Sequence, residues 1–295
     1  MEIIPHPNKE FMKKYERHEP LIKDHTAMIA FKACKRKFFY QIVLGKVPKE
    51  DAIYFAWGQA YHKFREVLEL TEDQTKATIA GLEIWLAKQG ADPPVGHKFA
   101  FLTRARLVKS FIKAFEWWEK EKKEKRIEVV AVEQSFNIQL PDGTFTGGRA
   151  DQIVRLNGKL WGRDFKTSSK EGKFYSRTLD PNDQFTRYTY SESKLSGERV
   201  HGQLIEVLYN SAKAGPEITA YIAARSQYQL DQWEKDNMME NKLLDLCREN
   251  DIWPMEEVGC SFCPYHSVCK MPTEGAMMAK LDQEYMTRPW DHTNI

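Results

Sequence analysis

The feature that most constrains the fold is the segment over residues 144–168, which reads TFTGGRADQIVRLNGKLWGRDFKTS. Its centre, Asn157-Gly158, separates two runs rich in β-forming residues. An Asn-Gly pair in that setting is the strongest short-range hairpin signal, because both turn residues must adopt φ > 0. A two-residue turn also fixes the register and pairs Leu156 with Lys159. The segment therefore predicts an antiparallel hairpin whose pairing is known along its length.

This register places two carboxylates face to face. Counting back from the turn, Asp151 lies opposite Asp164, and directly opposed Cβ atoms are ~4.5–5.5 Å apart. Lys166 follows two residues later on the same face. Two carboxylates at this distance repel each other unless a divalent cation lies between them, and hard oxygen ligands suit Mg²⁺ or Mn²⁺. Because a lysine beside the metal can stabilise charge on a phosphate, these residues predict phosphodiester hydrolysis.

The alternative interpretation is that the charged face of the hairpin is simply solvated, since an Asp-x-Lys pattern is common. The flanking residues favour the metal site. Phe165, Ile153 and Trp161 are large and apolar, and Gly147-Gly148 allows a close approach of backbone.

Composition excludes several classes of protein. The chain has 295 residues and a net charge of only +2, so a nucleic-acid surface would have to come from local clustering of basic residues. No apolar run approaches ~18 residues, and the N-terminus lacks the apolar core of a signal peptide. We therefore expect a soluble cytoplasmic protein without membrane association; for a phage-encoded protein this would be the host cytoplasm. Five cysteines in that compartment favour metal ligands, catalytic thiols or inert thiols over disulfides.

The residue pattern predicts an α/β protein with a mixed central β-sheet flanked by helices. Helices are expected over 58–70, 73–89, 99–125, 181–195 and 227–250, and strands over 127–140, 144–156, 159–166, 200–209 and 218–225. The strand, helix and strand over 159–209 predict a right-handed crossover to a parallel neighbour. The expected parts are an N-terminal arm (1–24), one domain (25–272) with a helical part (58–126), a sheet (127–226) and a C-terminal helix with cysteines (227–272), and a polar tail (273–295). The tail is compatible with partner docking or with disorder.

The segment over 25–44 interleaves basic and aromatic residues within a short predicted helix. The basic residues are Lys32, Lys35, Arg36 and Lys37, and the aromatic residues are Phe31, Phe38, Phe39 and Tyr40. Two interpretations are equally open. The rings and cations could contact nucleic acid, or the helix could be amphipathic with its rings in the core.

Four cysteines form a candidate metal site. Cys260, Cys263 and Cys269 follow the pattern C-x2-C-x5-C, and Cys34 stands far away in the sequence. Four soft ligands suit a [4Fe–4S] cluster or tetrahedral Zn²⁺, and His266 could replace one cysteine in a zinc site. A metal joining these positions would close nearly the whole chain into one loop and stabilise it. The alternative is a set of buried structural thiols, which is how we interpret the fifth cysteine, Cys247.

Taken together, the hairpin, the tripeptide DFK over 164–166, the segment around Cys34 and the C-terminal cysteines resemble the PD-(D/E)XK nuclease superfamily. Within it, they are similar to the RecB/AddB-type exonucleases that carry an iron–sulfur cluster. The resemblance runs over about 25–271. It implies a restriction-endonuclease-like core with an N-terminal helical insertion.

The resemblance assigns roles to individual residues. The peptide ADQIV resembles the strand that bears the metal-binding aspartate, here Asp151, and DFKT resembles the (D/E)-x-K motif. Asp164 would then be a metal ligand and Lys166 the catalytic lysine, and the Phe165 carbonyl would also face the metal. The peptide GQAYHKFRE resembles the helical G-x-x-x-H motif, which makes His62 a candidate ligand. The alternative for His62 is an ordinary helical histidine.

Two further motifs complete the resemblance. QFTRY resembles a Q-x3-Y motif, in which Gln184 and Tyr188 lie one helical turn apart and could both reach the substrate or orient the site. Glu133, in AVEQSF, resembles an acidic position on the preceding strand. A two-residue loop would turn Glu133 away from the metal, whereas a three-residue loop would place it opposite Asp151.

The resemblance implies a divalent-metal-dependent DNA exonuclease acting on ends and on single-stranded DNA in recombination, repair or replication, with a structural iron–sulfur cluster. One alternative is a non-catalytic DNA-end-binding or adaptor protein that retains the nuclease fold, and another is a zinc-binding protein without nuclease activity. The sequence has no G-x-x-x-x-G-K-[ST] motif, so an unwinding partner would be a separate helicase or recombination protein.

Overall fold

The structure is a computed structural model that describes residues 23–49, 52–124, 126–169, 173–288 and 290. The chain divides into two compact units. The cysteine unit combines Met1–Glu50, Asn137–Gly148 and Asp231–Ile295, and the sheet unit combines Asp51–Phe136 and Arg149–Leu230. All but the last two residues of the predicted N-terminal arm lie outside the described residues.

The central element is a mixed five-stranded sheet with strand order β2–β3–β4–β5–β6. Its strands are β2 (Ile127–Gln139), β3 (Phe145–Leu156), β4 (Lys159–Ser168), β5 (Val200–Tyr209) and β6 (Glu217–Ala224). β4 and β5 are parallel, whereas β3–β4 and β5–β6 are antiparallel. The expected mixed sheet is confirmed, and every strand begins and ends within two residues of its predicted bounds.

The β3–β4 hairpin forms as its turn chemistry requires. Asn157 and Gly158 adopt φ values of 51° and 75°, the left-handed conformation that a two-residue type I′ turn needs at both positions. Leu156 pairs with Lys159. The predicted turn is therefore confirmed, and its register is confirmed as far as Gln152 and Arg163, one step before the expected pairing of Asp151 with Asp164.

After β4 the chain crosses to β5 through two helices, α7 (Lys173–Ser176) and α8 (Asp183–Ser196). The Asn182 side chain caps α8 by accepting the Phe185 N–H at 3.2 Å, which satisfies a donor that the first turn would leave free. Gly197, with φ of 67°, ends the helix. Because β5 pairs in parallel with β4, the predicted crossover to a parallel strand is confirmed.

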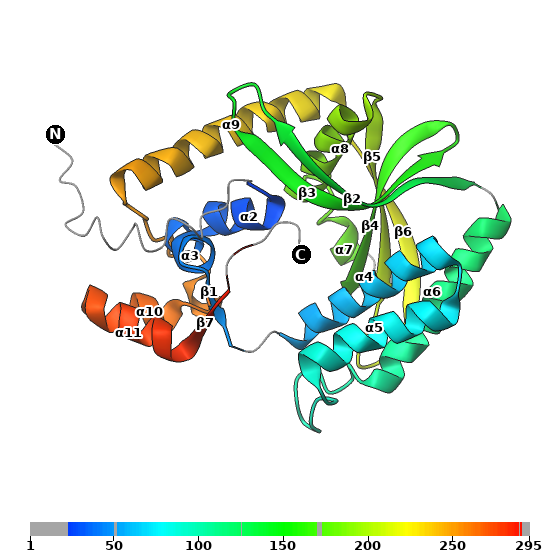
Figure 1. The fold of residues 1–295 in the computed structure, drawn as a ribbon, viewed down its shortest axis with the longest axis horizontal. Coiled ribbons are helices and arrows are strands. Elements are labelled where there is room, and N and C mark those ends of the chain that lie inside the picture. The colour runs from blue at the N-terminus through cyan, green and yellow to red at the C-terminus, as the bar shows by residue number, and fades with distance from the viewer. Residues whose placement is uncertain (1–22, 50–51, 125, 170–172, 289, 291–295) are drawn as a thin grey trace. The chain divides into compact units, whose positions relative to one another are not determined.

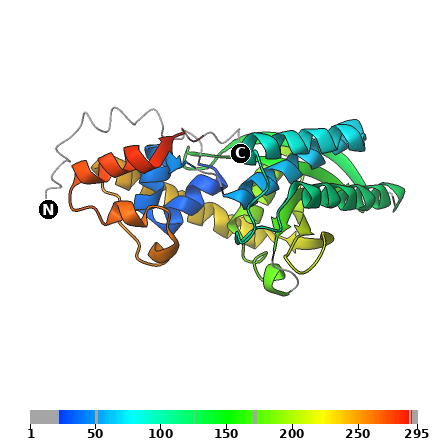
Figure 2. The same cartoon turned by 90° about the horizontal axis from the view of Figure 1, so that it is seen from below.

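Three helices of the sheet unit form one layer. They are α4 (Ile53–Thr71), α5 (Gln74–Gln89) and α6 (Arg104–Glu124), and Figures 1 and 2 show them lying alongside one another. Phe64 of α4 stacks on Phe111 of α6 with ring centroids 4.4 Å apart. A Cβ on Gly81 of α5 would lie 2.5 Å from the Phe111 ring. The layer is therefore packed through ring contacts that require glycine at this position of α5.

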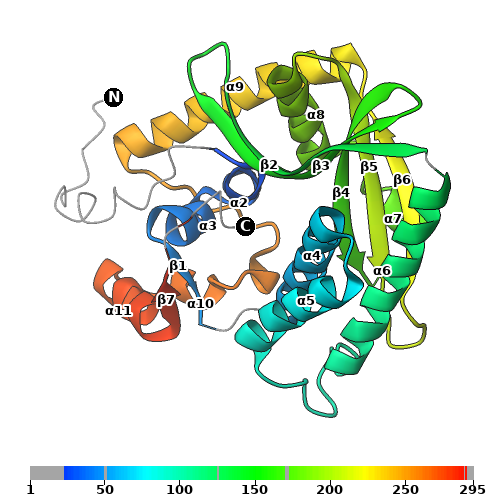
Figure 3. The same cartoon turned by 45° about the vertical axis from the view of Figure 1, so that its right-hand side comes forward.

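Alternate residues of β4 face opposite sides of the sheet. The Phe165 ring lies 4.3 Å from the Arg65 guanidinium of α4. A Cβ on Gly162 would instead lie 2.3 Å from the Glu192 carboxylate of α8. The helices α4 and α8, which are both seen next to β4 in Figure 3, therefore cover opposite faces of this strand, and Asp164 points to the α8 side.

The cysteine unit has an aromatic core that joins N-terminal and C-terminal segments. Its elements are α2 (His25–Ala33), α3 (Lys35–Phe38), the π-helix η2 (Phe39–Val43), β1 (Lys46–Pro48), most of α9 (Gln227–Asn250), the 3₁₀ helix η3 (Cys260–Phe262), α10 (His266–Cys269), α11 (Glu274–Glu284) and β7 (Tyr285–Thr287). Phe38 and Phe39 stack on Trp253 with centroids 5.8 and 5.3 Å apart, and Tyr40 packs on Tyr265 at 5.6 Å. The rings of the 25–44 segment therefore belong to the core, which favours the amphipathic interpretation of that segment over a nucleic-acid contact by its rings.

Two details of the cysteine unit differ from the sequence-based expectation. The helix expected over 25–44 is interrupted at Cys34, whose backbone is extended with φ −170° and ψ 119°. The segment expected as a polar tail contains α11 and β7, and β7 pairs antiparallel with β1 through Val47 and Met286. Among the described residues, no helix combines the length and the apolar character that spanning a bilayer would require.

Candidate active site

The predicted aspartates come from neighbouring strands at the point where the β3–β4 ladder stops. The last paired residues are Gln152 and Arg163, one step before Asp151 and Asp164. The Phe165 N–H donates to Asp151 Oδ2 at 2.7 Å. In a regular antiparallel ladder this N–H would donate to a backbone carbonyl of the neighbouring strand, and here the carboxylate side chain replaces that carbonyl. The regular pairing of the two strands therefore ends immediately before the two aspartates.

His62 approaches this pair from α4. Its Nδ1 lies 3.3 Å from Asp151 Oδ2. Burial lowers the pKa of His62, but the Asp151 carboxylate outweighs burial and raises the pKa overall. Conversely, burial works to raise the pKa of Asp151, whereas His62 and Lys166 hold it below its ordinary value. The arrangement therefore keeps Asp151 ionised, and it brings His62 to Asp151 as a hydrogen-bonding partner.

The Lys166 ammonium group pairs with Asp164. Its Nζ donates to Oδ1 at 2.8 Å and lies 2.7 Å from Oδ2, but Oδ2 is buried and accepts no hydrogen bond of good geometry. Burial raises the pKa of Asp164; Lys166 opposes this, and the Asp151 carboxylate acts in the same direction as burial. The site is therefore a buried pair of carboxylates that a further positive charge would stabilise.

The two residues of the predicted Q-x3-Y motif lie on α8 in different surroundings. Gln184 Nε2 donates to Asp164 Oδ1 at 3.2 Å, so it orients this carboxylate. Tyr188 is buried one turn further along, and its ring packs edge-on against Phe136 of β2 with centroids 5.6 Å apart. The structure thus brings Gln184 to the aspartates and Tyr188 to β2.

Glu133 on β2 also faces the aspartates. Burial raises the pKa of Glu133 to about 7, and the Asp151 carboxylate is the second cause. Arg149 Nε lies 2.8 Å from Glu133 Oε2. The backbone of Glu133 has φ of 51° within a strand, a value uncommon for a residue with a side chain. The orientation that the sequence left open is therefore toward Asp151.

A buried charge network that was not predicted links α4 to the sheet. Glu206 of β5 accepts a hydrogen bond from Tyr61 at 2.9 Å and pairs with Arg65 at 3.0 Å and with Arg163 at 2.5 Å. Tyr61 and Arg65 flank His62 on α4, whereas Arg163 lies on β4. The network therefore fixes the two site-bearing elements relative to each other. The signal in the sequence was Glu206 itself, a carboxylate inside the apolar run LIEVLY.

The donor set suits a hard divalent cation. Asp151 and Asp164 supply carboxylate oxygens, which Mg²⁺ and Mn²⁺ prefer, and Asp164 Oδ2 is a buried oxygen without a hydrogen bond. Within the part of the chain that the structure describes, no group of three or more His, Cys, Asp or Glu side chains is gathered closely enough to hold a metal ion. A cation would therefore rest first on the two aspartates, and His62 and the Phe165 carbonyl remain predicted ligands.

The four predicted cluster cysteines are free thiols in the cysteine unit. Cys34 Sγ accepts the Glu256 N–H at 3.5 Å, and the Cys260 thiol donates to the Glu256 carbonyl at 3.2 Å. Burial raises the pKa of the Cys269 thiol, and the nearby Cys263 and Cys34 act in the same direction. Their chemistry suits a soft metal, but among the described residues no three of them are gathered at metal-binding distance. The structure therefore does not show a metal cluster here.

Comparison with known proteins agrees with the arrangement of the strands. A crystal structure from Eubacterium rectale, described as a "Putative exonuclease", aligns with a TM-score of 0.56 over 93% of this chain and 97% of that chain, at 11% identity. This likeness shows a shared fold and confirms the expected α/β core. A structure of SSO0001 aligns over 84% of this chain and 98% of that chain at 13% identity, with a TM-score of 0.29.

The family comparison is more specific. No curated protein matches the chain. The family model of the PD-(D/E)XK nuclease superfamily matches residues 25–270. The predicted superfamily is thus confirmed, whereas the narrower RecB/AddB type stays a prediction. Because the match spans most of the sequence and includes both strands that carry the aspartate pair, the chain belongs to the PD-(D/E)XK nuclease superfamily.

Proposed function

We propose that the protein is a divalent-metal-dependent DNA exonuclease that hydrolyses phosphodiester bonds from ends, on single-stranded DNA. The observation that carries this proposal is the Asp151–Asp164 pair, in which Asp164 is buried and Asp151 nearly so, with Lys166 bonded to Asp164. Superfamily membership supports nucleic-acid hydrolysis. The resemblance to RecB/AddB-type exonucleases favours the attack on ends, in recombination, repair or replication within the cytoplasm.

Asp151 and Asp164 would hold Mg²⁺ or Mn²⁺, with His62 and the Phe165 carbonyl as further ligands. When bound, such a cation makes water more acidic and polarises a phosphoryl oxygen. His62 and the Phe165 N–H hold Asp151 in place, and Gln184 holds Asp164. These contacts keep both carboxylates oriented before the substrate arrives.

Lys166 is the group that we assign to the transition state. Its side chain is 28% exposed, whereas that of its partner Asp164 is 3% exposed, so the ammonium group can reach both the carboxylate and an incoming phosphate. A positive charge beside the phosphate stabilises the additional negative charge of the transition state. Removing one preorganised contact of this kind costs about 10²–10³ in rate.

The test is digestion of end-labelled single-stranded DNA in Mg²⁺, Mn²⁺ or EDTA. We expect shortening from the ends in either metal and none in EDTA. Lys166→Ala should lower the rate by at least about 10²-fold in a protein that still folds, as judged from its circular dichroism spectrum. Lys159→Ala, which removes an exposed lysine from the other end of the same strand, should retain full activity.

Substantial cleavage by Lys166→Ala, or equal loss in the Lys159 control, would reject this assignment of the site. If the unmodified protein binds DNA without cleaving it, the alternative function as a DNA-end-binding or adaptor protein replaces the nuclease. We also propose that a separate helicase or recombination protein supplies the single strands on which the nuclease acts.

We also propose that Cys34, Cys260, Cys263 and Cys269 bind a [4Fe–4S] cluster, with Zn²⁺ as the alternative, and that no catalytic step passes through it. The chemistry of four thiols in one unit supports this, although their present separation does not. Iron, sulfide and zinc should be measured in anaerobically purified protein beside Cys34→Ser and, as a control, Cys247→Ser. Protein that contains neither metal would contradict the proposal.

A further inference from the structure

Four aromatic rings, from the first turn of α4 and from the loop before α6, form a continuous strip in the sheet unit, in which Phe99 and Phe101 are half-buried. Tyr54 and Phe55, in the first turn of α4, are 49% and 61% exposed. Their ring centroids are 4.7 Å apart, Tyr54 lies 5.7 Å from Phe99, and Phe99 lies 6.3 Å from Phe101. We call these four residues the aromatic strip. The exposed Tyr54 and Phe55 rings extend the half-buried pair into water, and an apolar patch of this kind commonly marks a binding site.

Positive charges accompany the aromatic strip. Lys98 Nζ lies 5.3 Å from the centre of the Phe99 ring, and the Arg106 guanidinium lies 5.8 Å from the centre of the Phe101 ring. The segment over 93–115 contains five lysine and arginine residues and no aspartate or glutamate. Two of the five, Arg104 and Lys113, pair with Asp92 and Glu116 just outside it, so the local positive charge rests on Lys98, Arg106 and Lys109. The strip is therefore both aromatic and locally basic, which fits an anionic ligand with flat apolar groups.

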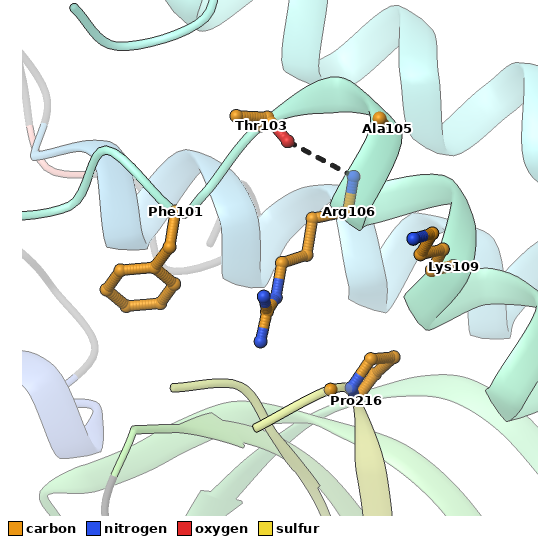
Figure 4. Close-up of a pocket in the computed structure, with 7 residues that line it drawn as sticks. Phe101, Thr103, Ala105, Arg106, Lys109 and Pro216 are labelled. Carbon is orange, nitrogen blue, oxygen red and sulfur yellow. Dashed lines mark hydrogen bonds between the residues drawn. The ribbon is translucent and has the colours of Figure 1, made fainter. Parts of the chain in front are cut away.

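A cavity of about 340 Å³ adjoins the Phe101 end of the strip. Its lining is shown in Figure 4 and consists of Phe101, Thr103, Ala105, Arg106, Lys109, Gly215 and Pro216. The Arg106 guanidinium donates to Asn210 Oδ1 at 3.1 Å and to the Ser211 carbonyl at 2.5 Å. These partners are neutral oxygens, so they fix the guanidinium without neutralising it. The cavity thus has a wall of fixed positive charge beside a ring.

Both ends of the strip lead toward the aspartates. Phe55 and His62 are seven residues apart on α4, which places them on one face of the helix about 10 Å apart along its axis. At the other end, the Asn210 N–H donates to the Ser168 carbonyl at 2.9 Å, and Ser168 lies two residues after Lys166 on β4. A strand lying on the strip could therefore continue to the site without leaving the sheet unit.

We propose that the aromatic strip and the Arg106 cavity bind single-stranded DNA, with bases stacked on the rings and a phosphate beside Arg106 and Lys109. This inference rests on the proposed nuclease function and adds the surface that selects single strands. Stacking on aromatic rings combined with basic side chains is the means by which single strands are bound without sequence preference. The cations interleaved with the rings favour this ligand over an apolar protein partner.

The test measures binding rather than cleavage, by fluorescence anisotropy of a labelled oligothymidine in EDTA. Stacking contributes enough per base that Tyr54→Ala/Phe55→Ala should weaken binding by about 10- to 100-fold. Phe55→Trp should retain affinity, because a ring is kept. The control is Tyr228→Ala, which removes a tyrosine that is 71% exposed on α9 and should change nothing.

Two further measurements separate the bases from the phosphates. An oligonucleotide of abasic residues should bind the unmodified protein about as weakly as oligothymidine binds the double variant. Lys98→Ala and Lys109→Ala should each reduce the slope of log K against log salt by about 0.7, the value for one phosphate on a single strand. Because no step in EDTA depends on catalysis, these results are independent of the nuclease assay.

Unchanged affinity of the double variant would overturn the proposal, as would equal loss in Tyr228→Ala or full affinity for the abasic strand. Metal-dependent cleavage together with such a result would support the proposed nuclease function and refute only the proposed role of the aromatic strip in DNA binding. Loss of binding in the double variant, in a protein that never cleaves, would instead support the strip and refute the nuclease. Melting temperatures of all variants identify any that fail to fold.

Discussion

Replacing Glu192 with glutamine should stabilise the protein, and the gain should increase with pH. Glu192 is fully buried on α8, and its Oε2 accepts a hydrogen bond from the Gln203 amide at 2.7 Å, while Oε1 is among the buried oxygens without a partner. Burial raises the pKa of Glu192 to about 8; Gln203 opposes this, and the Asp164 and Asp151 charges add to it. The carboxyl group is therefore protonated in the folded protein at neutral pH.

The magnitude follows from proton linkage. An ordinary glutamate has a pKa of 4.5, and each pKa unit between the unfolded and folded states is worth about 1.4 kcal/mol. Below the ordinary value of 4.5 both states are protonated and the stabilising contribution is complete. As pH rises to about 8, only the unfolded state releases its proton, so the free energy of unfolding falls. Between pH 5 and pH 8 the loss is about 3–4 kcal/mol, and glutamine does not incur it because it does not titrate.

The assay is the melting temperature of wild type and Glu192→Gln at pH 5 and pH 8. With roughly 2–4 °C per kcal/mol for a unit of this size, the gain from the substitution should be on the order of 10 °C larger at pH 8. Glu198→Gln is the control, because Glu198 is exposed and its pKa is lowered through its hydrogen bond to Arg155. An equal gain at both pH values would show that Glu192 is ionised in the folded protein and would refute the reasoning.

Two further predictions concern the packing around β4. Gly162→Ala should lower the melting temperature, because its Cβ would lie 2.2 Å from the Gln203 amide oxygen, and overpacking of a core costs about 1–3 kcal/mol; an unchanged melting temperature would show that Gln203 can move aside. Arg65→Met should lower the free energy of unfolding by about 3–5 kcal/mol, because the buried Glu206 carboxylate loses one of its positively charged partners. Lys63→Met, which breaks the half-exposed pair with Glu66, should cost less than about 1 kcal/mol, and equal losses in these two variants would contradict the role of the network.

The part of the site that could be predicted is the part encoded locally. Asn157 and Gly158 determine the turn, and the turn determines the register as far as Gln152 and Arg163, the neighbours of Asp151 and Asp164. The structure departs from this extrapolation only at its end, where the Phe165 N–H bonds to the Asp151 carboxylate and the ladder stops. Turn chemistry fixes pairing near the turn, but it does not show where a side chain will replace a backbone acceptor.

The contacts that could not be predicted join residues far apart in the sequence. Arg65, Arg163 and Glu206 are unremarkable charged residues until the crossover places β5 beside β4 and α4 covers that face. Cysteine spacing has the same weakness. The pattern indicates which thiols could share a metal, but only the fold determines their separation, and the described structure gathers no three of them.

Glu133 shows how much can depend on one residue of a loop. The sequence permitted a two-residue or a three-residue loop after β2, with opposite orientations for this carboxylate. In the structure Leu140 N–H donates to the Thr144 carbonyl at 2.8 Å, which leaves three residues in the loop, and the last of these, Gly143, has φ of 83° as a three-residue hairpin requires. In a regular ladder this pairing places Glu133 opposite Asp151, and burial together with the Asp151 charge raises the pKa of Glu133 to about 7. Deleting one loop residue would therefore be expected to remove a carboxylate from the active site while leaving both aspartates in place.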